Sequence, residues 1–392
     1  MADLGFPVFD GDNHLYEPPA ALLEHLPPAR RRDVQFVDVN GRTRIALRGH
    51  ITDYIPNPTF ERIGRPGSLG AFYRGDNPEG RTRREMLGEA IDCPPSFRLP
   101  EPRLGLLDEQ GVAQALVFPT LANLVEHNLA DDPELTHEVI HALNRWLDEV
   151  WTFDYRHRLF AVPVVTLGLV EPAVTELEWL LGRGARAVLI RPAPPTGWRG
   201  SRSFGLAEFD PFWARVQEAD IPVCLHQTQS VVSGYVDLWE PPSQANAFAS
   251  SAFRILGLGH RDIQDSLTSL ICHGTLSRFP GLKIYSVENG SDWIGYLAAG
   301  LARVHRQMPQ DFAEHPLDVL RRNVWVNPFW EEPLADLLEH VGVGHVVFGS
   351  DYPHVEGMEE PLAYAAHLER LGCAPSARRI MHDNLTGLLG AG

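Results

Sequence analysis

The chain has 392 residues, 44% of them hydrophobic, and a formal net charge of −17 at pH 7. This charge opposes nucleic-acid phosphates and anionic lipids, so we expect neither a nucleic-acid nor a membrane partner. No secretory signal or membrane-spanning apolar run is visible, and the four cysteines are widely spaced, which favours a cytoplasmic location.

The first motif is FDGDNHLYEP at residues 9–18, which sets Asp10, Asp12 and His14 at alternate positions. Alternate residues of a β-strand share one face, so two carboxylates and an imidazole are expected to project together. Such a face is typical of half a metal site. The same residues could simply end a strand and begin a turn.

Residues 27–98 are rich in Pro, Gly and Arg and show weak periodicity. They predict a long insertion after the first strand, and segments of this length in compact domains are usually functional covers. A lid over a site and an oligomerisation element are both compatible with this composition.

From about residue 100, apolar runs alternate with amphipathic, helix-like stretches. The predicted strands after FPVFDGD (6–12) are residues 114–120, 159–165, 186–192, 221–227, 282–288, 323–328 and 345–351. Continuous apolar strands are buried on both faces, and eight such units predict an α/β fold of the (β/α)₈ TIM-barrel type. We expect one domain over residues 1–392. No glycine-rich dinucleotide fingerprint follows a strand, so an open dinucleotide-binding sheet is disfavoured.

Barrel active sites lie at the carboxyl ends of the strands. Nitrogen and oxygen donors occur at the ends of the first, fifth, sixth and eighth predicted strands: Asp12, His14, His226, Glu288, Asp351 and His354. Each donor alone has an ordinary structural explanation. Donors from four strands on one face of a barrel predict a metal site.

Several motifs together resemble the amidohydrolase-2 family, the branch of the amidohydrolase superfamily with aminocarboxymuconate-semialdehyde decarboxylase-like enzymes. They are DGDNHLYEP (10–18), LPEPRLGLLDEQGVAQALVFPT (99–120), CLHQ (224–227), HGTLSRFPGLKIYSVENGSDWI (273–294), FGSDYPHVEG (348–357) and RRIMHDNLTGLLG (378–390). The resemblance covers nearly the whole chain except about residues 27–98.

The resemblance implies one divalent metal held by Asp12, His14, His226 and Asp351, with His273 as a catalytic histidine beside it. The commonest family pattern begins with His-x-His, and the carboxylate of Asp12 in place of the first imidazole favours manganese alongside zinc. Binuclear members use a carboxylated lysine at the end of the fourth strand. The only lysine of this chain is at position 283, at the beginning of the sixth strand, so a mononuclear site follows.

The resemblance favours non-oxidative decarboxylation of an aromatic or unsaturated carboxylic acid, with Asp351 transferring the proton and His273 orienting and activating. Hydrolysis of an amide, ester, lactone or thioester by activated water is the alternative, and a non-catalytic binding barrel is a third. We expect a small-molecule substrate and no organic cofactor. A homodimer is plausible.

Other residues are expected to support the site. Asp10 and Glu17 would hold the first-strand ligands, while Arg191 could pair with a substrate carboxylate and Glu288 could hold a ligand in place. For Arg191 and Glu288, an internal salt bridge or hydrogen bond is the commoner role, and His354 could instead cap a turn. Aromatic residues on the loops indicate a bulky apolar substrate, or rings that only pack the loops together: Tyr54, Phe60, Phe72, Tyr73, Tyr235, Trp239, Phe248, Phe253, Phe329 and Trp330.

Overall fold

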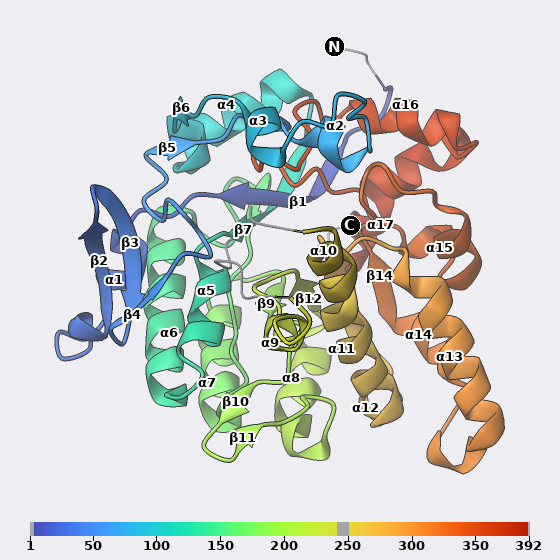
Figure 1. The fold of residues 1–392 in the computed structure, drawn as a ribbon. Coiled ribbons are helices and arrows are strands. Elements are labelled where there is room, and N and C mark those ends of the chain that lie inside the picture. Colours follow the sequence, from blue (N-terminus) through green and yellow to red (C-terminus); the bar gives the residue numbers. More distant parts are fainter. Residues whose placement is uncertain (1–3, 241–250, 391–392) are drawn as a thin grey trace.

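The computed structural model describes residues 4–240 and 251–390 (Figure 1). Its central feature is a series of parallel strands in two sheets. The first sheet contains β1 (Phe9–Leu15), β7 (Gln114–Pro119) and β8 (Leu159–Ala161). The second contains β9 (Val188–Ile190), β12 (Pro222–His226), β13 (Lys283–Val287) and β14 (Val324–Val326).

Three isolated parallel bridges join these sheets into a ring. They are Val164 with Leu189, Val326 with Val346, and Asn13 with Tyr352. The order of neighbours therefore follows the order of the chain and returns to β1, as the predicted (β/α)₈ barrel requires.

The eighth predicted strand, residues 345–351, is not a regular strand. It makes one bridge to β14, and the Phe348 amide donates to the Ile380 carbonyl at 3.0 Å instead of to a neighbouring strand. Single hydrogen bonds still tie the segment to β1: the Gly11 amide donates to the Phe348 carbonyl at 2.9 Å and the Asp351 amide to the Asp12 carbonyl at 2.7 Å. A diverted amide explains why an apolar run typical of a strand forms no continuous ladder.

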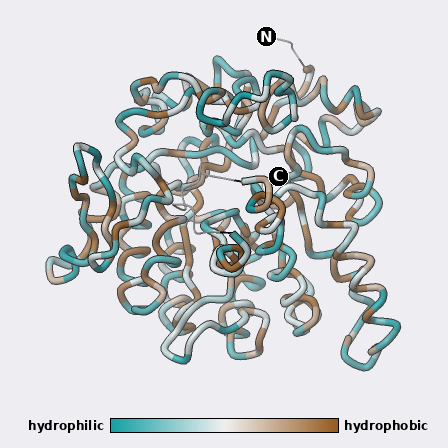
Figure 2. Tube along the Cα trace, in the orientation of Figure 1, coloured by the Kyte–Doolittle hydropathy of each residue, from teal (hydrophilic) through white to brown (hydrophobic). Residues whose placement is uncertain are grey.

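Helices follow most of the strands (Figure 1). Along these helices, hydrophobic residues alternate with hydrophilic ones (Figure 2). The larger ones in the described ranges are α4 (Pro100–Gln110), α6 (Pro133–Val150), α7 (Val170–Leu181), α8 (Asp210–Ala219), α11 (Arg261–Cys272), α13 (Trp293–Gln307), α14 (Pro316–Asn323) and α16 (Ala363–Arg370). Helix α6 begins as its sequence predicts, because the Asp132 carboxylate accepts the Leu135 amide at 3.0 Å and Pro133 fills the first turn. Among the described residues, no helix combines the length and apolarity needed to cross a lipid bilayer.

The predicted insertion at residues 27–98 forms small elements of its own. Strands β2 (Val34–Val39), β3 (Arg42–Leu47) and β4 (His50–Thr52) make an antiparallel sheet, and β5 (Arg62–Ile63) pairs with β6 (Ile91–Asp92). Helices α2 (Gly70–Tyr73) and α3 (Arg83–Leu87) follow β5. Val34, Ile45 and Phe97 belong to the same buried cluster as the barrel strands. The insertion is therefore packed onto the barrel, while its role as a lid or oligomerisation element stays a prediction.

The contact between β1 and the eighth segment depends on Gly349. A methyl group there would lie 2.4 Å from the Asp12 Cβ and 2.9 Å from the Asn327 side-chain nitrogen. We expect Gly349→Ala to lower the free energy of unfolding by about 1–3 kcal/mol, because the strands must move apart. Urea denaturation measures this change.

The matched control is Gly105→Ala in the exposed part of α4, where a Cβ would have no neighbour within 4 Å. This variant should gain about 0.5–1 kcal/mol, as alanine in place of glycine does within a helix. A Gly349→Ala protein as stable as the wild type would show that the ring closure tolerates the extra atom.

Candidate metal centre

Four side chains converge at the carboxyl ends of β1, β12 and β13. Asp12, His14, His226 and Glu288 each offer one ligand atom, and these atoms all lie within 4.8 Å of one another. The His14 Nε2 atom is 3.1 Å from His226 Nε2 and 3.3 Å from Asp12 Oδ1. Glu288 Oε2 is 3.4 Å from His226 Nε2. Three of these side chains are fully or almost fully buried, and Glu288 is slightly exposed.

A second group overlaps the first and contains Asp351 and His354 together with His14 and Glu288. Asp351 Oδ1 is 3.6 Å from His14 Nε2 and 2.6 Å from His354 Nδ1. The His354 ring lies 4.0 Å from the His14 ring, centroid to centroid, and its Nε2 is 3.3 Å from the Thr120 hydroxyl. His354 therefore reaches the site.

The donor set fits a divalent cation. His226 Nδ1 donates to the Gln227 carbonyl at 2.8 Å, so a neutral ring turns the lone pair of Nε2 toward His14 and Asp12. Asp12 Oδ1 is buried with no hydrogen-bond donor in the described part of the chain. Burial lowers the pKa of His14 well below its usual value, which keeps this imidazole neutral. A cation can bind a carboxylate and two imidazole nitrogens together, without any proton between them.

The charge of Asp12 is consistent with this. Burial by itself would raise the pKa of Asp12, but the nearby imidazoles of His14 and His226 lower it below the usual range. Burial raises the pKa of Glu288 and Asp351 well above their usual values, and the neighbouring carboxylates add to the effect. Without a cation, several carboxylates in this space repel one another.

Glu288 and Asp351 share an unusual backbone conformation. Their φ angles are 55° and 54°, in the left-handed region that side chains with a Cβ atom adopt at a cost. Each residue directly follows a strand or strand-like segment, so the positive φ turns the chain where the carboxylate enters the site. Backbone strain of this kind is concentrated at functional sites.

Asp10 supports the site and is not one of its donors. A β-bulge lies between Asp10 and Asn13, so the alternation expected for Asp10, Asp12 and His14 holds only for the last two. Asp10 accepts hydrogen bonds from the Ser350 amide at 2.8 Å and the Asn13 side chain at 3.0 Å. Burial raises its pKa to about 6. It therefore ties β1 to the segment that carries Asp351.

Glu17 has a comparable position at the end of β1. Its Oε1 accepts the Leu121 amide at 2.8 Å, which links β1 to the chain after β7. Burial raises the pKa of Glu17 to about 7.

Phe60 of the insertion stacks on Tyr16 with 4.5 Å between ring centroids, and the Tyr16 ring centroid lies 5.8 Å from that of His354. The insertion thus contributes to the packing beside the site.

His273 does not reach the centre, which corrects its predicted placement beside the metal. It directly follows α11, its side chain is exposed, and its Nδ1 is 3.2 Å from the Ser269 hydroxyl. The residue comes before β13, whereas the donors lie where the strands end. Glu288, at the carboxyl end of β13, occupies the cluster instead. Its position at the end of the predicted strand 282–288 was the sequence signal for this.

Lys283 fits its predicted place at the opposite end of the strand. It is the first residue of β13, and its Nζ is 2.7 Å from Asp220 Oδ1. Arg191 directly follows β9 and is buried.

Only some of the aromatic loop residues lie where a substrate pocket could use them. Tyr235, Trp239 and Phe253 are 52%, 64% and 43% exposed, so they do not line an enclosed pocket in the described structure. The guanidinium carbon of Arg74 lies 4.6 Å from the centroid of the Trp330 ring. The Phe329 amide donates to the Glu332 carboxylate at 3.0 Å. Phe248 lies outside the described residues.

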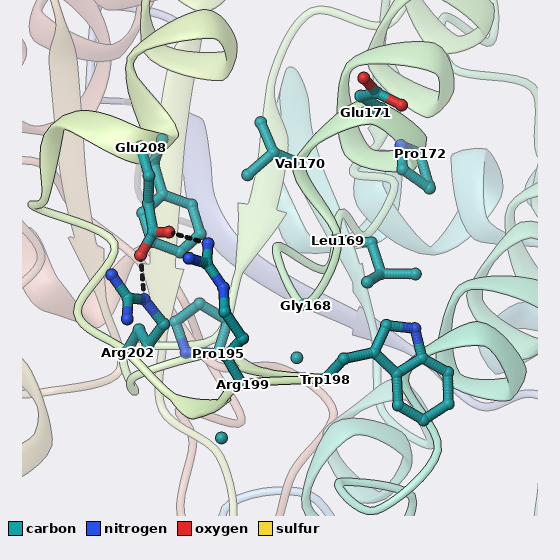
Figure 3. Close-up of a pocket in the computed structure, with 13 residues that line it drawn as sticks. Gly168, Leu169, Val170, Glu171, Pro172, Pro195, Trp198, Arg199, Arg202 and Glu208 are labelled. Carbon is teal, nitrogen blue, oxygen red and sulfur yellow. Dashed lines mark hydrogen bonds and ion pairs between the residues drawn. The ribbon is translucent and has the colours of Figure 1, made fainter.

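A separate cavity of about 460 Å³ lies between the start of α7 and the β10–β11 hairpin (Thr196–Gly197 and Gly200–Ser201) (Figure 3). Both of its arginines, Arg199 and Arg202, pair with Glu208 (Figure 3). None of the donors of the metal centre lines it. Because both arginines already have a carboxylate partner, we assign the chemistry to the metal centre and not to this cavity.

The two histidines make a direct test of the metal centre. We expect about one divalent metal per chain in the wild type and a loss of most of it in His226→Ala, since one of few nitrogen donors is removed. Elemental analysis of the purified proteins gives the ratio. His273→Ala is the matched control and should keep its metal, and an equal loss in both variants would contradict the geometry.

Comparisons with known proteins identify the family of the chain. The model of the family described as Amidohydrolase matches residues 19–389, so Asp12 and His14 precede the matched range. The solved structure of an amidohydrolase from Mycobacterium avium subsp. paratuberculosis K-10 is 37% identical, with a TM-score of 0.93, and covers 100% of this chain and 99% of that one.

Two decarboxylases are more distant. The dihydroxybenzoic acid decarboxylase from Polaromonas sp. JS666, solved with manganese and 2-nitroresorcinol, shares the fold at 14% identity and a TM-score of 0.61, over 98% of this chain and 97% of that one. The 6-methylsalicylic acid decarboxylase of Penicillium expansum is 28% identical over 161 residues, or 40% of this chain and 46% of that protein. The chain spans about half the length of the curated relatives that it matches. The family match and the full-length structural likeness together show that the chain belongs to the amidohydrolase family.

Proposed function

We propose that this protein is a metal-dependent decarboxylase that removes CO₂ from an aromatic carboxylic acid without redox chemistry. The observation that carries the proposal is the partly buried Asp351–His354 pair, with 2.6 Å between Asp351 Oδ1 and His354 Nδ1, directly beside the Asp12, His14 and His226 donors. A proton donor next to a cation site is what this reaction requires, because a proton must replace the departing carboxylate. The decarboxylases among the relatives support the same reaction.

Each residue has a defined role in this proposal. Asp12, His14, His226 and Asp351 would hold the ion, and Glu288 lies beside them. The Glu288 Oε2 and Asp351 Oδ1 atoms are 3.8 and 3.6 Å from His14 Nε2. When bound, the ion supplies positive charge that binds and polarises the substrate carboxylate. The hard oxygen of Asp12 and the manganese found in a relative favour manganese over zinc.

Asp351 would transfer the proton to the ring carbon that bears the carboxylate. A C–H bond forms there, the C–C bond to the carboxylate breaks, and its electron pair restores the aromatic ring as CO₂ leaves. No oxidant or reductant takes part, and the proposed step uses no organic cofactor. His354 holds the Asp351 carboxyl group in place, and the Thr120 hydroxyl in turn holds His354.

The direct experiment is a panel of hydroxylated benzoic acids, incubated with the manganese-loaded protein while CO₂ is measured. In D₂O, one deuterium should appear on the product ring at the carbon that lost the carboxylate. Incorporation of ¹⁸O from labelled water into a product carboxylate, with no release of CO₂, would favour the hydrolase alternative instead. A homodimer and a cytoplasmic location stay predictions.

We expect Asp351→Asn to lower kcat by about 10²–10⁴-fold, because the amide cannot transfer the proton. Its metal content should remain near that of the wild type, since three donors on β1 and β12 are intact. Steady-state kinetics and elemental analysis on the same preparation check both points. Asp383→Asn, which changes an exposed carboxylate near the C-terminus, is the matched control. Full activity in Asp351→Asn would remove Asp351 from the reaction.

A further inference from the structure

Arg191 lies beside the metal centre. The parallel register pairs Cys224 with Leu189 and Leu225 with Ile190, so the next step along β12 and β9 sets Arg191 next to His226. Neighbouring strands are about 4.8 Å apart, and paired residues of parallel strands point to the same face. The Arg191 side chain therefore leaves β9 on the same face, and at the same end of the barrel, as the His226 donor.

The guanidinium of Arg191 is held by neutral groups. Its Nε donates to the Thr228 hydroxyl at 3.3 Å, and its Nη2 donates to the Gln229 carbonyl at 2.7 Å and to His127 Nδ1 at 3.1 Å. Burial, and after it the charge of Arg191, lowers the pKa of His127 to about 4, so that ring is neutral. None of these contacts balances the positive charge.

The charge is also poorly exposed to water, since Arg191 is only 8% exposed. Two acids, Glu126 and Asp262, act on Arg191 through space, but neither carboxylate comes within ion-pair distance of it in the described structure. Burial raises the pKa of both acids. Buried charges are normally paired, because leaving water is costly for an ion.

One part of the guanidinium is open. The Nη1 atom makes none of the hydrogen bonds found among the described residues, and it is not one of the fully enclosed atoms that lack a partner. An arginine has five N–H donors, and the two on Nη1 remain for a ligand. The fixed Nε and Nη2 contacts hold this open end in one orientation before any ligand binds.

We propose that Arg191 binds a second carboxylate of the substrate, so that the preferred substrates are small aromatic acids with two acidic groups. The inference rests on the proposed function for the reacting carboxylate, which the metal centre would hold. The second carboxylate supplies the counter-charge that Arg191 lacks, and Arg191 sets which end of the molecule faces Asp351. It is a specificity residue and not part of the proton transfer.

The test is equilibrium binding of benzoate and of the three benzenedicarboxylates, which differ in the position of the second carboxylate. Titration calorimetry with and without Mn²⁺ gives the affinities. We expect the wild type to bind at least one dicarboxylate tenfold or more tightly than benzoate. Arg191→Met should remove this preference and leave the benzoate affinity within about twofold, since the interaction with the first carboxylate is retained.

Two further variants make the result decisive. Arg186→Met changes another arginine close to β9, one that donates to the Leu389 carbonyl, and should keep the wild-type preference. Arg191→Lys keeps the charge and should retain part of the preference, which tests the proposal even when Arg191→Met fails to fold. Thermal unfolding of each variant reports folding separately.

Equal affinity of the wild type for benzoate and all three dicarboxylates would overturn the proposal, as would equal losses for benzoate and dicarboxylates in Arg191→Met. Both results would make Arg191 a structural residue. An Arg191-dependent preference in a protein that releases no CO₂ would reject decarboxylation and leave the carboxylate subsite standing. The two proposals therefore fail in different ways.

Discussion

The contact between β1 and residues 348–352 is the constraint on which the rest of the structure depends. It closes the ring of parallel segments through the hydrogen bonds of Gly11 with Phe348 and of Asp351 with Asp12. The same contact brings Asp12 and Asp351 to one place, although the two residues are at opposite ends of the chain. Gly349 and the bonds between Asp10 and Ser350 allow the close approach. Fold closure and site assembly are thus a single packing event.

This arrangement places several buried polar groups at the carboxyl ends of the barrel strands. Glu288 and Asp351 have strained backbone angles. Among the described residues, one oxygen of Asp12 has no hydrogen-bond donor and Arg191 has no carboxylate in contact. None of these features stabilises the fold by itself, since buried charges without partners oppose folding. A cation and an anionic ligand would satisfy them together, which links the metal centre and the Arg191 subsite through charge.

The histidines illustrate how position along a strand decides function. His226 ends β12 and faces the donors of β1, whereas His273 ends α11 and bonds to serines at the surface. Both occur in short motifs with a histidine beside an apolar run, but His226 lies at the end of the predicted strand 221–227, whereas His273 precedes the predicted strand 282–288. The carboxylate of Glu288 takes the place on β13 because it follows the last residue of that strand.

The sequence by itself determined the alternation of strands and helices, the long insertion and most of the donors, because hydrophobic period and strand-end residue types are local properties of the chain. Asp12, His14, His226 and Asp351 could be found in this way, since each lies at the end of a predicted strand. Only the tertiary structure decided that Asp10 turns to Ser350, that His354 reaches Asp351, that His273 stays outside and that Arg191 has no carboxylate partner among the described residues. These outcomes depend on a bulge, on positive φ angles and on distances across the closed ring, and such distances arise only when segments far apart in sequence pack together.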